Sequence, residues 1–261
     1  VDGDEFGRLR AHDLAVALAA HRAQGGAPVF AISATAGTTN LGMVDDLAGL
    51  ADVAEQEGLW LHADGAYGGA AVLTVTGREA LAGIDRVQSM VVDPHKWLFA
   101  GYDCCALLYR DVRIARAAFT QTAEYLEAVE VSADQWNPSD YAVHLTRRAR
   151  GVPFWFSLAA HGTDAYRDAV DSCLATARAF TAAVQAASHL ELFAPTTLSI
   201  VTFTRPGWAR DDYQRWSDQH LADGEFFIAV SEFRGDPLLR VCLVHPHTTP
   251  ADLQRVIDSL V

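Results

Sequence analysis

The run RVQSMVVDPHK, residues 86–96, decides the fold of this 261-residue chain. Its centre is apolar and rich in valine, as expected of a buried strand, and Pro94 prevents the strand from continuing. Polar side chains, Lys96 among them, therefore follow the strand at its carboxyl end. In sheets built from parallel strands this is the edge at which ligands bind. The run places a lysine where chemistry can take place.

Helices and strands alternate on both sides of this run. Apolar spacing, glycine stops and β-prone runs predict helices at 11–24 and 45–57, and strands at 28–35, 59–64, 86–93 and 104–110. Such alternation predicts βαβ units around a mostly parallel sheet. Residues 111–141 carry few structural signals and are predicted to be a loop.

The pattern changes in the second half of the chain. Residues 154–187 are predicted to be helical, with the aromatic side chains of 154–156 in the core. Shorter elements follow: strands at 190–194, 199–204, 226–232 and 238–244, and helices at 211–222 and 250–260. They indicate a small α+β unit. We therefore divide the chain into residues 1–150, a large-domain portion, and residues 151–261, a connecting helix with a small domain.

Composition excludes several classes of function. The formal net charge of −13 argues against nucleic acid and anionic membranes as partners, and no run of eighteen apolar residues predicts a membrane span. The four cysteines lack C-x-x-C spacing and are predicted to be reduced thiols of a cytoplasmic protein. His245 and His247 have H-x-H spacing, but no third ligand is near in sequence, so we predict no metal.

Asp64 ends the predicted strand 59–64 and is followed by small residues, GAYGG at 65–69. A carboxylate at a buried strand end needs a partner, because burying an unpaired charge is costly. One interpretation is an N-cap of the following helix. The other is a partner for a cationic ligand, such as a protonated ring nitrogen, with the small residues letting a flat ring approach the backbone.

Lys96 also has two interpretations. Most lysines point into water. Here Trp97, Leu98 and Phe99 are expected to bury the amine in part, which favours the free base, and a free amine can form a Schiff base. Asp64 and Lys96 lie about one βαβ repeat apart, so neighbouring strands can present both to one ligand. A lysine for the aldehyde and a carboxylate for the pyridine nitrogen are what pyridoxal phosphate requires.

Four motifs occur in order along the chain: ATAGTTNLGMVDDL at 34–47, WLHADGAYGG at 60–69, DPHKWL at 93–98 with YDCC at 102–105, and LTRRARGVPFWF at 145–156. This set resembles the group II pyridoxal-phosphate-dependent decarboxylases, which include aromatic-L-amino-acid, histidine and glutamate decarboxylases. The resemblance implies the aspartate-aminotransferase type of α/β fold (fold type I), with a partial large domain, a mixed, mostly parallel sheet and a small C-terminal α+β domain.

The resemblance also implies a role for each matching residue. Lys96 would form the Schiff base with pyridoxal 5'-phosphate, Asp64 would pair with its pyridine nitrogen, and Ala66 would pack under its ring. His95 would contact the phosphate. Thr39 would lie near the ring and the substrate carboxylate.

Three further residues follow from the same likeness. Tyr125 matches a tyrosine of a mobile family loop that reaches the partner subunit of a homodimer and protonates the substrate carbon after CO2 leaves. Arg147 matches an arginine near the dimer interface and the cofactor. Asp93 departs from the family, which often has asparagine there, and places an acid near the phosphate.

The activity implied is decarboxylation of an L-amino acid, with an aromatic substrate favoured and 2,4-diaminobutyrate and glutamate open. Two alternatives remain: another fold type I lyase or aminotransferase, such as a relative of sphingosine-phosphate lyase, and a non-catalytic fragment that binds the cofactor weakly. The family carries a phosphate-gripping turn and a stacking histidine upstream of these motifs. We therefore expect the chain to be truncated at its N-terminus and weak or inactive alone.

Overall fold

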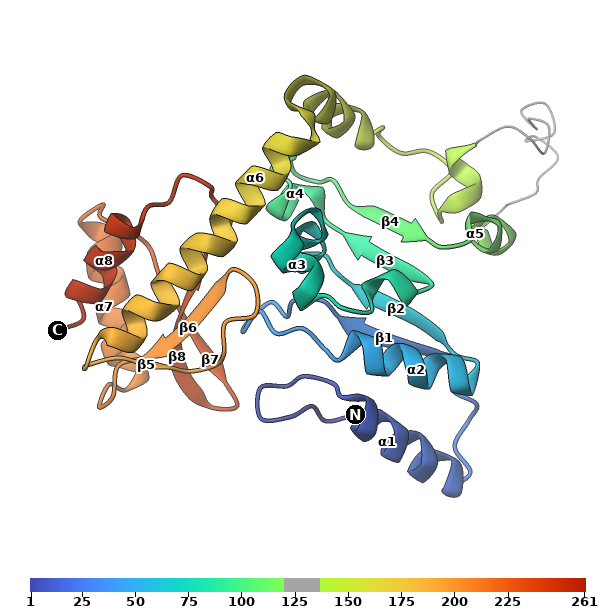
Figure 1. Ribbon diagram of the computed structural model, residues 1–261, viewed down its shortest axis with the longest axis horizontal. Coiled ribbons are helices and arrows are strands. Elements are labelled where there is room, and N and C mark those ends of the chain that lie inside the picture. The colour runs from blue at the N-terminus through green and yellow to red at the C-terminus, as the bar shows by residue number, and fades with distance from the viewer. Residues whose placement is uncertain (120–136) are drawn as a thin grey trace.

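Two four-stranded sheets, joined by the long helix α6 (Gly151–Ala186), form the molecule (Figure 1). The computed structural model describes residues 1–119 and 137–261. The first sheet has the order β1 (Ala31–Thr35), β2 (Trp60–Asp64), β3 (Ser89–Val92) and β4 (Ala106–Tyr109). β1, β2 and β3 are parallel, and β4 runs antiparallel to β3. The mixed, mostly parallel sheet predicted from the sequence is confirmed.

Helices α1 (Ala11–Ala23), α2 (Leu47–Glu57) and α3 (Val75–Ala80) accompany this sheet. The two adjacent aspartates before α2, Asp45 and Asp46, make different structural contacts. Asp46 caps α2 by accepting from the Gly49 N–H at 3.0 Å. Asp45 is buried and accepts from the N–H groups of Leu9 and Thr35, each at 2.7 Å, so it fastens the N-terminal segment to β1.

Several short elements were absent from the sequence prediction. They are η1 (Gly68–Leu73), α3 (Val75–Ala80), η2 (Ile84–Arg86), α4 (Pro94–Trp97), α5 (Val112–Phe119) and η4 (Pro138–Tyr141). The prediction of a loop throughout 111–141 is wrong at α5 and η4. A helix of two turns carries too few apolar repeats to stand out in a sequence, yet α5 is amphipathic and buries Ala115.

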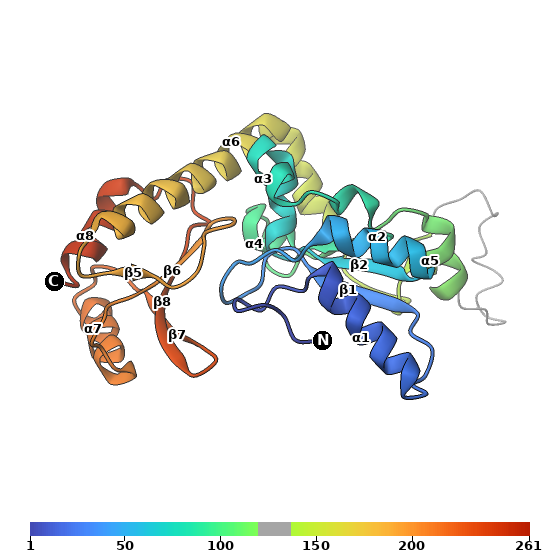
Figure 2. The same ribbon diagram turned by 60° about the horizontal axis from the view of Figure 1, so that its bottom comes forward.

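The second sheet is entirely antiparallel, with the order β5 (Glu191–Leu192), β6 (Ile200–Thr204), β8 (Asp236–Cys242) and β7 (Ala229–Phe233). Helix α6 packs along β5 and β6 and against α8 (Pro250–Asp258), while α7 (Arg210–Ala222) contacts β7 and β8 (Figure 2). This is the α+β unit that the second half of the sequence predicted.

The apolar core of the first half extends into the second half, which also has a core of its own around Phe180 and Phe203. Val170 and Leu174 of α6, with Leu198 and Ile200 from the start of the second sheet, join the cluster beneath the first sheet. At the same junction the Tyr67 hydroxyl and Ser199 Oγ are hydrogen-bonded at 2.5 Å, and the Ser199 N–H donates to the Tyr67 oxygen at 3.0 Å.

The aromatic run at the start of α6 is not in the core. Trp155 and Phe156 are each 61% exposed, so the prediction that 154–156 are core residues is wrong for these two. The first turns of α6 extend beyond the elements that cover the later part of the helix (Figure 1). Local apolar content does not specify which element covers a helix.

Candidate functional site

The carboxyl ends of the three parallel strands lie at one edge of the first sheet. Thr35 at the end of β1 is in register with Asp64 at the end of β2, and Asp64 is in register with Val91 of β3. Backbone hydrogen bonds then join the turns that follow. The Ala36 N–H donates to the Asp64 carbonyl at 2.8 Å, and the Asp93 N–H donates to the Ala66 carbonyl at 3.0 Å. These bonds bring the Asp64–Ala66 turn against the start of α4, which carries His95 and Lys96.

Asp64 is exposed at this edge, and its carboxylate is oriented by its own turn. Its Oδ1 accepts from the Ala66 N–H at 3.0 Å. The expectation of a buried carboxylate is wrong, because the strand ends where the sheet meets solvent. A carboxylate with one oxygen fixed by the backbone and an exposed position is available to a cationic group.

Glycine at position 68 is required by close packing within the protein. A Cβ there would lie 2.1 Å from the Ala36 carbonyl oxygen, which is closer than any side chain tolerates. The small residues after Asp64 therefore let the turns after β1 and β2 approach each other. We expected them to admit a flat ring, and the structure supplies this second reason for them.

Lys96 lies on α4, the single turn of helix that begins at Pro94. Its side chain is 44% exposed, and its Nζ is 3.0 Å from Oδ2 of Asp93. Trp97 is fully buried and stacks on Tyr67, with ring centroids 5.1 Å apart, while Phe99 is 41% exposed. The Lys96 side chain is thus partly buried, as expected, but Trp97 is directed into the core by the helical turn that directs Lys96 outward.

His95 is anchored by the loop that follows α4. Its Nδ1–H donates to the Cys104 carbonyl at 2.6 Å, and its backbone N–H donates to the same oxygen at 3.3 Å. The ring also meets the edge of Tyr102. With Nδ1 committed to a carbonyl, the imidazole presents Nε2, which lies 3.9 Å from Oδ2 of Asp93.

The remaining predicted residues are less closely tied to the edge cluster, which consists of Asp64, Asp93, His95 and Lys96. Thr39 is exposed in the turn after β1, where the neighbouring Thr38 N–H donates to the Met43 carbonyl at 2.8 Å. Arg147 donates to the Pro138 carbonyl at 3.1 Å. Tyr125 lies outside the described residues.

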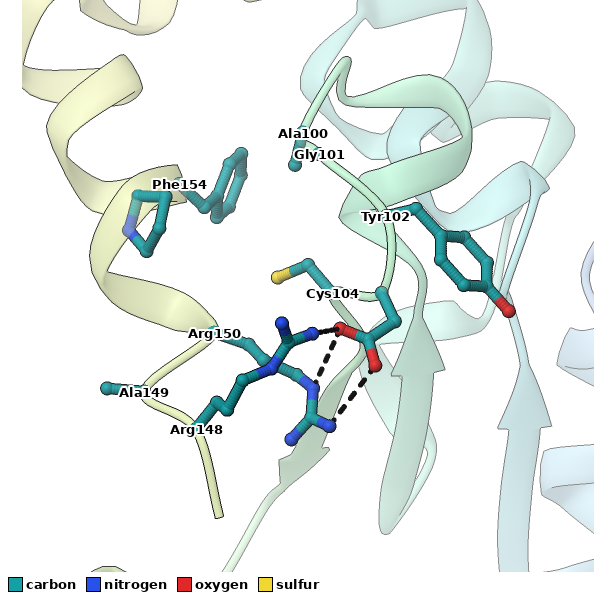
Figure 3. A pocket seen from close by; sticks show the side chains of 10 residues that line it. Ala100, Gly101, Tyr102, Cys104, Arg148, Ala149, Arg150 and Phe154 are labelled. Carbon is teal, nitrogen blue, oxygen red and sulfur yellow. Dashed lines mark hydrogen bonds and ion pairs between the residues drawn. The ribbon is translucent and has the colours of Figure 1, made fainter.

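A cavity of about 220 Å³ adjoins the cluster, between the loop after α4 and the start of α6 (Figure 3). Arg148 and Arg150 reach across to Asp103: Arg148 donates at 2.5 Å, and Arg150 donates through two nitrogens at 2.9 and 3.1 Å. The hydrogen bonds from Arg150, and to a smaller extent that from Arg148, hold the pKa of the Asp103 carboxyl well below its usual range. Because Cys104 follows Asp103, the ion pairs brace the carbonyl that anchors His95.

Sequence reasoning missed Asp103 and its two arginines. The available signal was charge, with a single acid in YDCC and a basic run in RRAR. The partners are 45 and 47 positions apart in the sequence, which conceals the pairing. A second signal was also missed. Lys96 is the only lysine in the sequence, since every other residue counted with it as basic is arginine.

Neither a metal site nor a membrane span is found in the described part of the chain. Across residues 1–119 and 137–261 no group of three or more His, Cys, Asp or Glu side chains is placed to hold a metal ion. Within the same ranges no helix has the length and apolar character needed to cross a bilayer.

The sheet, its edge cluster and the small antiparallel domain define a fold type I protein, the aspartate-aminotransferase class. Residues 1–205 match the family described as the pyridoxal-dependent decarboxylase conserved domain. The chain belongs to this family, which confirms the resemblance seen in its motifs.

Similar proteins carry several substrate names. Over its full length the chain is 32% identical to an aromatic-L-amino-acid decarboxylase of Bacillus atrophaeus and covers 56% of that protein. Over 68% of its length it is 36% identical to human cysteine sulfinic acid decarboxylase and covers 36% of that protein. The structure of Oryza sativa TDC with PLP and tryptamine aligns with 97% of the chain and 54% of its own, at a TM-score of 0.86 and 25% identity. The chain thus spans about half the length of relatives it matches end to end.

Proposed function

We propose that the protein containing this chain is a carboxy-lyase that removes CO2 from an L-amino acid with bound pyridoxal 5'-phosphate. The observation that carries the proposal is the edge cluster. The turn that carries Asp64 and the start of α4, which carries the only lysine of the sequence, are joined by the hydrogen bond between the Ala66 carbonyl and the Asp93 N–H. Family membership favours this reaction over those of other fold type I lyases and aminotransferases.

The residues at the edge fit the cofactor. Lys96 would hold its aldehyde carbon covalently, and Asp64 would pair with the ring nitrogen and keep it protonated. His95 would offer Nε2 to the phosphate, Ala66 would pack under the ring, and Thr39 would lie near the substrate carboxylate. When bound, pyridoxal phosphate supplies an electron sink for the bond that breaks, and its ring depends on the Asp64 carboxylate for that property.

In this proposal Tyr125 returns a proton to the substrate carbon after CO2 leaves, and Arg147 lies near the interface of a homodimer. Both assignments rest on the positions of these residues in the family motifs. A cytoplasmic enzyme with a boundary near residue 150 completes the proposal. Helix α6 begins at Gly151, which supports that boundary.

An aromatic amino acid is the proposed substrate. Support comes from the aromatic-L-amino-acid decarboxylase of Bacillus atrophaeus, which matches the full length of the chain. Cysteine sulfinic acid decarboxylase, with an acidic substrate in its name, matches 68% of it. A panel of aromatic, acidic and basic L-amino acids, with CO2 release as the measurement, distinguishes these substrates.

Cofactor binding is tested by adding pyridoxal phosphate to the chain and recording the visible spectrum. We expect a new absorption band with the wild type and none with Lys96→Ala. Lys96→Arg is the matched control, because it keeps the positive charge without the reactive amine, and it also should show no band. A band in either variant would contradict the assignment of Lys96. A wild-type band without CO2 release from any amino acid would support the non-catalytic alternative.

A further inference from the structure

Asp93 is placed as a helix cap but does not act as one. It occupies the N-cap position of α4, where aspartate normally accepts a backbone N–H, yet its side chain makes no capping hydrogen bond. Its Oδ2 instead lies 3.0 Å from Nζ of Lys96. Only 14% of the Asp93 side chain is exposed, against 44% for Lys96. The Asp93 carboxylate is therefore largely buried, does not cap α4, and forms an ion pair with the single lysine.

The surroundings of Asp93 keep its carboxylate ionised and directed at Lys96. Burial acts to raise the pKa of Asp93, but hydrogen bonds from the Cys105 thiol and Lys96 outweigh it, and the net pKa is lowered. Burial and, after it, the hydrogen bond to Asp93 raise the pKa of Cys105 to about 11. The Cys105 side chain therefore remains a neutral thiol that donates to Asp93. His95 Nε2 stands 3.9 Å from the same carboxylate oxygen. Burial and the charges of Asp103 and Asp93 raise the pKa of the Cys104 thiol.

We propose that Asp93 is the resting counter-ion of Lys96, a positioning residue that holds the ammonium group against α4 until an aldehyde is present. The proposal deepens the proposed function, since it rests on Lys96 as the reacting amine. The ion pair engages the Lys96 nitrogen, and an amine held in such a pair is less available to attack a carbonyl. Asp93 therefore restrains Lys96 and keeps it in a single place at the sheet edge.

Acetylation with a trace of acetic anhydride tests this inference without any cofactor. Lys96 is the only lysine, so mass spectrometry compares its acetylation directly with that of the amino-terminal amine in the same molecule. In Asp93→Asn we expect the Lys96 rate, relative to that amine, to rise about two- to fivefold near neutral pH, as for loss of a half-exposed ion pair.

Asp85→Asn is the matched control, because Asp85 is exposed on η2, away from α4, and the substitution removes the same charge. It should leave the ratio unchanged. A measurement on the wild type alone guards against a variant that does not fold. Raising sodium chloride to about 1 M screens a half-exposed pair and should raise the Lys96 ratio, but not in Asp93→Asn.

An unchanged ratio in Asp93→Asn from pH 7 to pH 10, or a wild-type ratio indifferent to salt, would overturn the inference. Neither outcome depends on decarboxylation. If pyridoxal phosphate gave no band while the acetylation ratio rose, the proposed function would fail and the pairing of Asp93 with Lys96 would stand.

Discussion

At the scale of single residues, the site depends on the positions of a few side chains at the ends of strands. Asp64 was located correctly at a strand end from the pattern WLHAD, and Lys96 from the proline that stops the next strand. Their surroundings were not predictable from neighbours in the sequence. Trp97 adjoins Lys96 along the chain but points into the core, because consecutive residues on a helical turn face different directions.

Asp64→Asn should weaken the binding of pyridoxal phosphate about ten- to a hundredfold, as expected when a hydrogen bond to a charged group is lost. The amide oxygen still accepts from the Ala66 N–H, so thermal stability should change little. Titration of the visible band measures the affinity, and the unfolding temperature supplies the control. Equal affinities in the two proteins would remove Asp64 from the site.

At the scale of elements, centres were predicted better than ends. Residues 28–35 were expected to form a strand, but β1 starts at Ala31, where pairing with Trp60 of β2 begins. β1 is the outer strand of its sheet, and Phe30 just before it is 83% exposed. Pairing partners decide where a strand begins, and a single strand's sequence does not contain them.

Helix α6 is broken at Gly162, whose backbone (φ 77°, ψ 157°) lies in a region that only glycine adopts easily. Gly162→Ala should destabilise the fold by about 1–3 kcal/mol. The strain would come from the backbone alone, because no atom lies within 4 Å of an added Cβ. Chemical denaturation measures the loss.

Gly151→Ala is the control for this prediction. Gly151 begins the same helix, also has no atom within 4 Å of an added Cβ, and lacks a positive φ. Alanine there should be neutral or stabilising by up to about 1 kcal/mol. Equal effects of the two substitutions would show that the break in α6 is not a constraint.

At the scale of the whole molecule, the α/β class and the order of elements were predictable, but the contacts between the halves were not. The bond between Tyr67 and Ser199 joins residues 132 positions apart. No local sequence pattern predicts a hydrogen bond between residues so far apart. The tyrosine was visible in the motif AYGG, yet its part in joining the two sheets emerged only from the fold.

Tyr67→Phe should destabilise the fold by about 1–3 kcal/mol, because it leaves the buried Ser199 without its partner. It should also flatten the response to alkali. Burial raises the pKa of Tyr67 above its usual value of 10.0. The unfolded chain thus loses this proton first, and the wild-type stability, fully present below about pH 10, falls as the pH rises further. Denaturation at pH 8 to 11 measures both effects.

Tyr102→Phe is the control for this prediction, since the Tyr102 ring is 89% exposed. It should leave both the stability and its slope against pH close to those of the wild type. A Tyr67→Phe protein with the wild-type slope would show that the buried hydroxyl does not couple folding to alkali.

The scarcity of lysine has a practical consequence at the bench. Dyes, biotin esters and resins that attach through primary amines usually spread over many surface lysines of a protein. Here the single side chain open to them is the one at the proposed reaction centre. Attachment through that route would block the centre, and coupling through exposed carboxylates would also reach it, because Asp64 is exposed at the same edge.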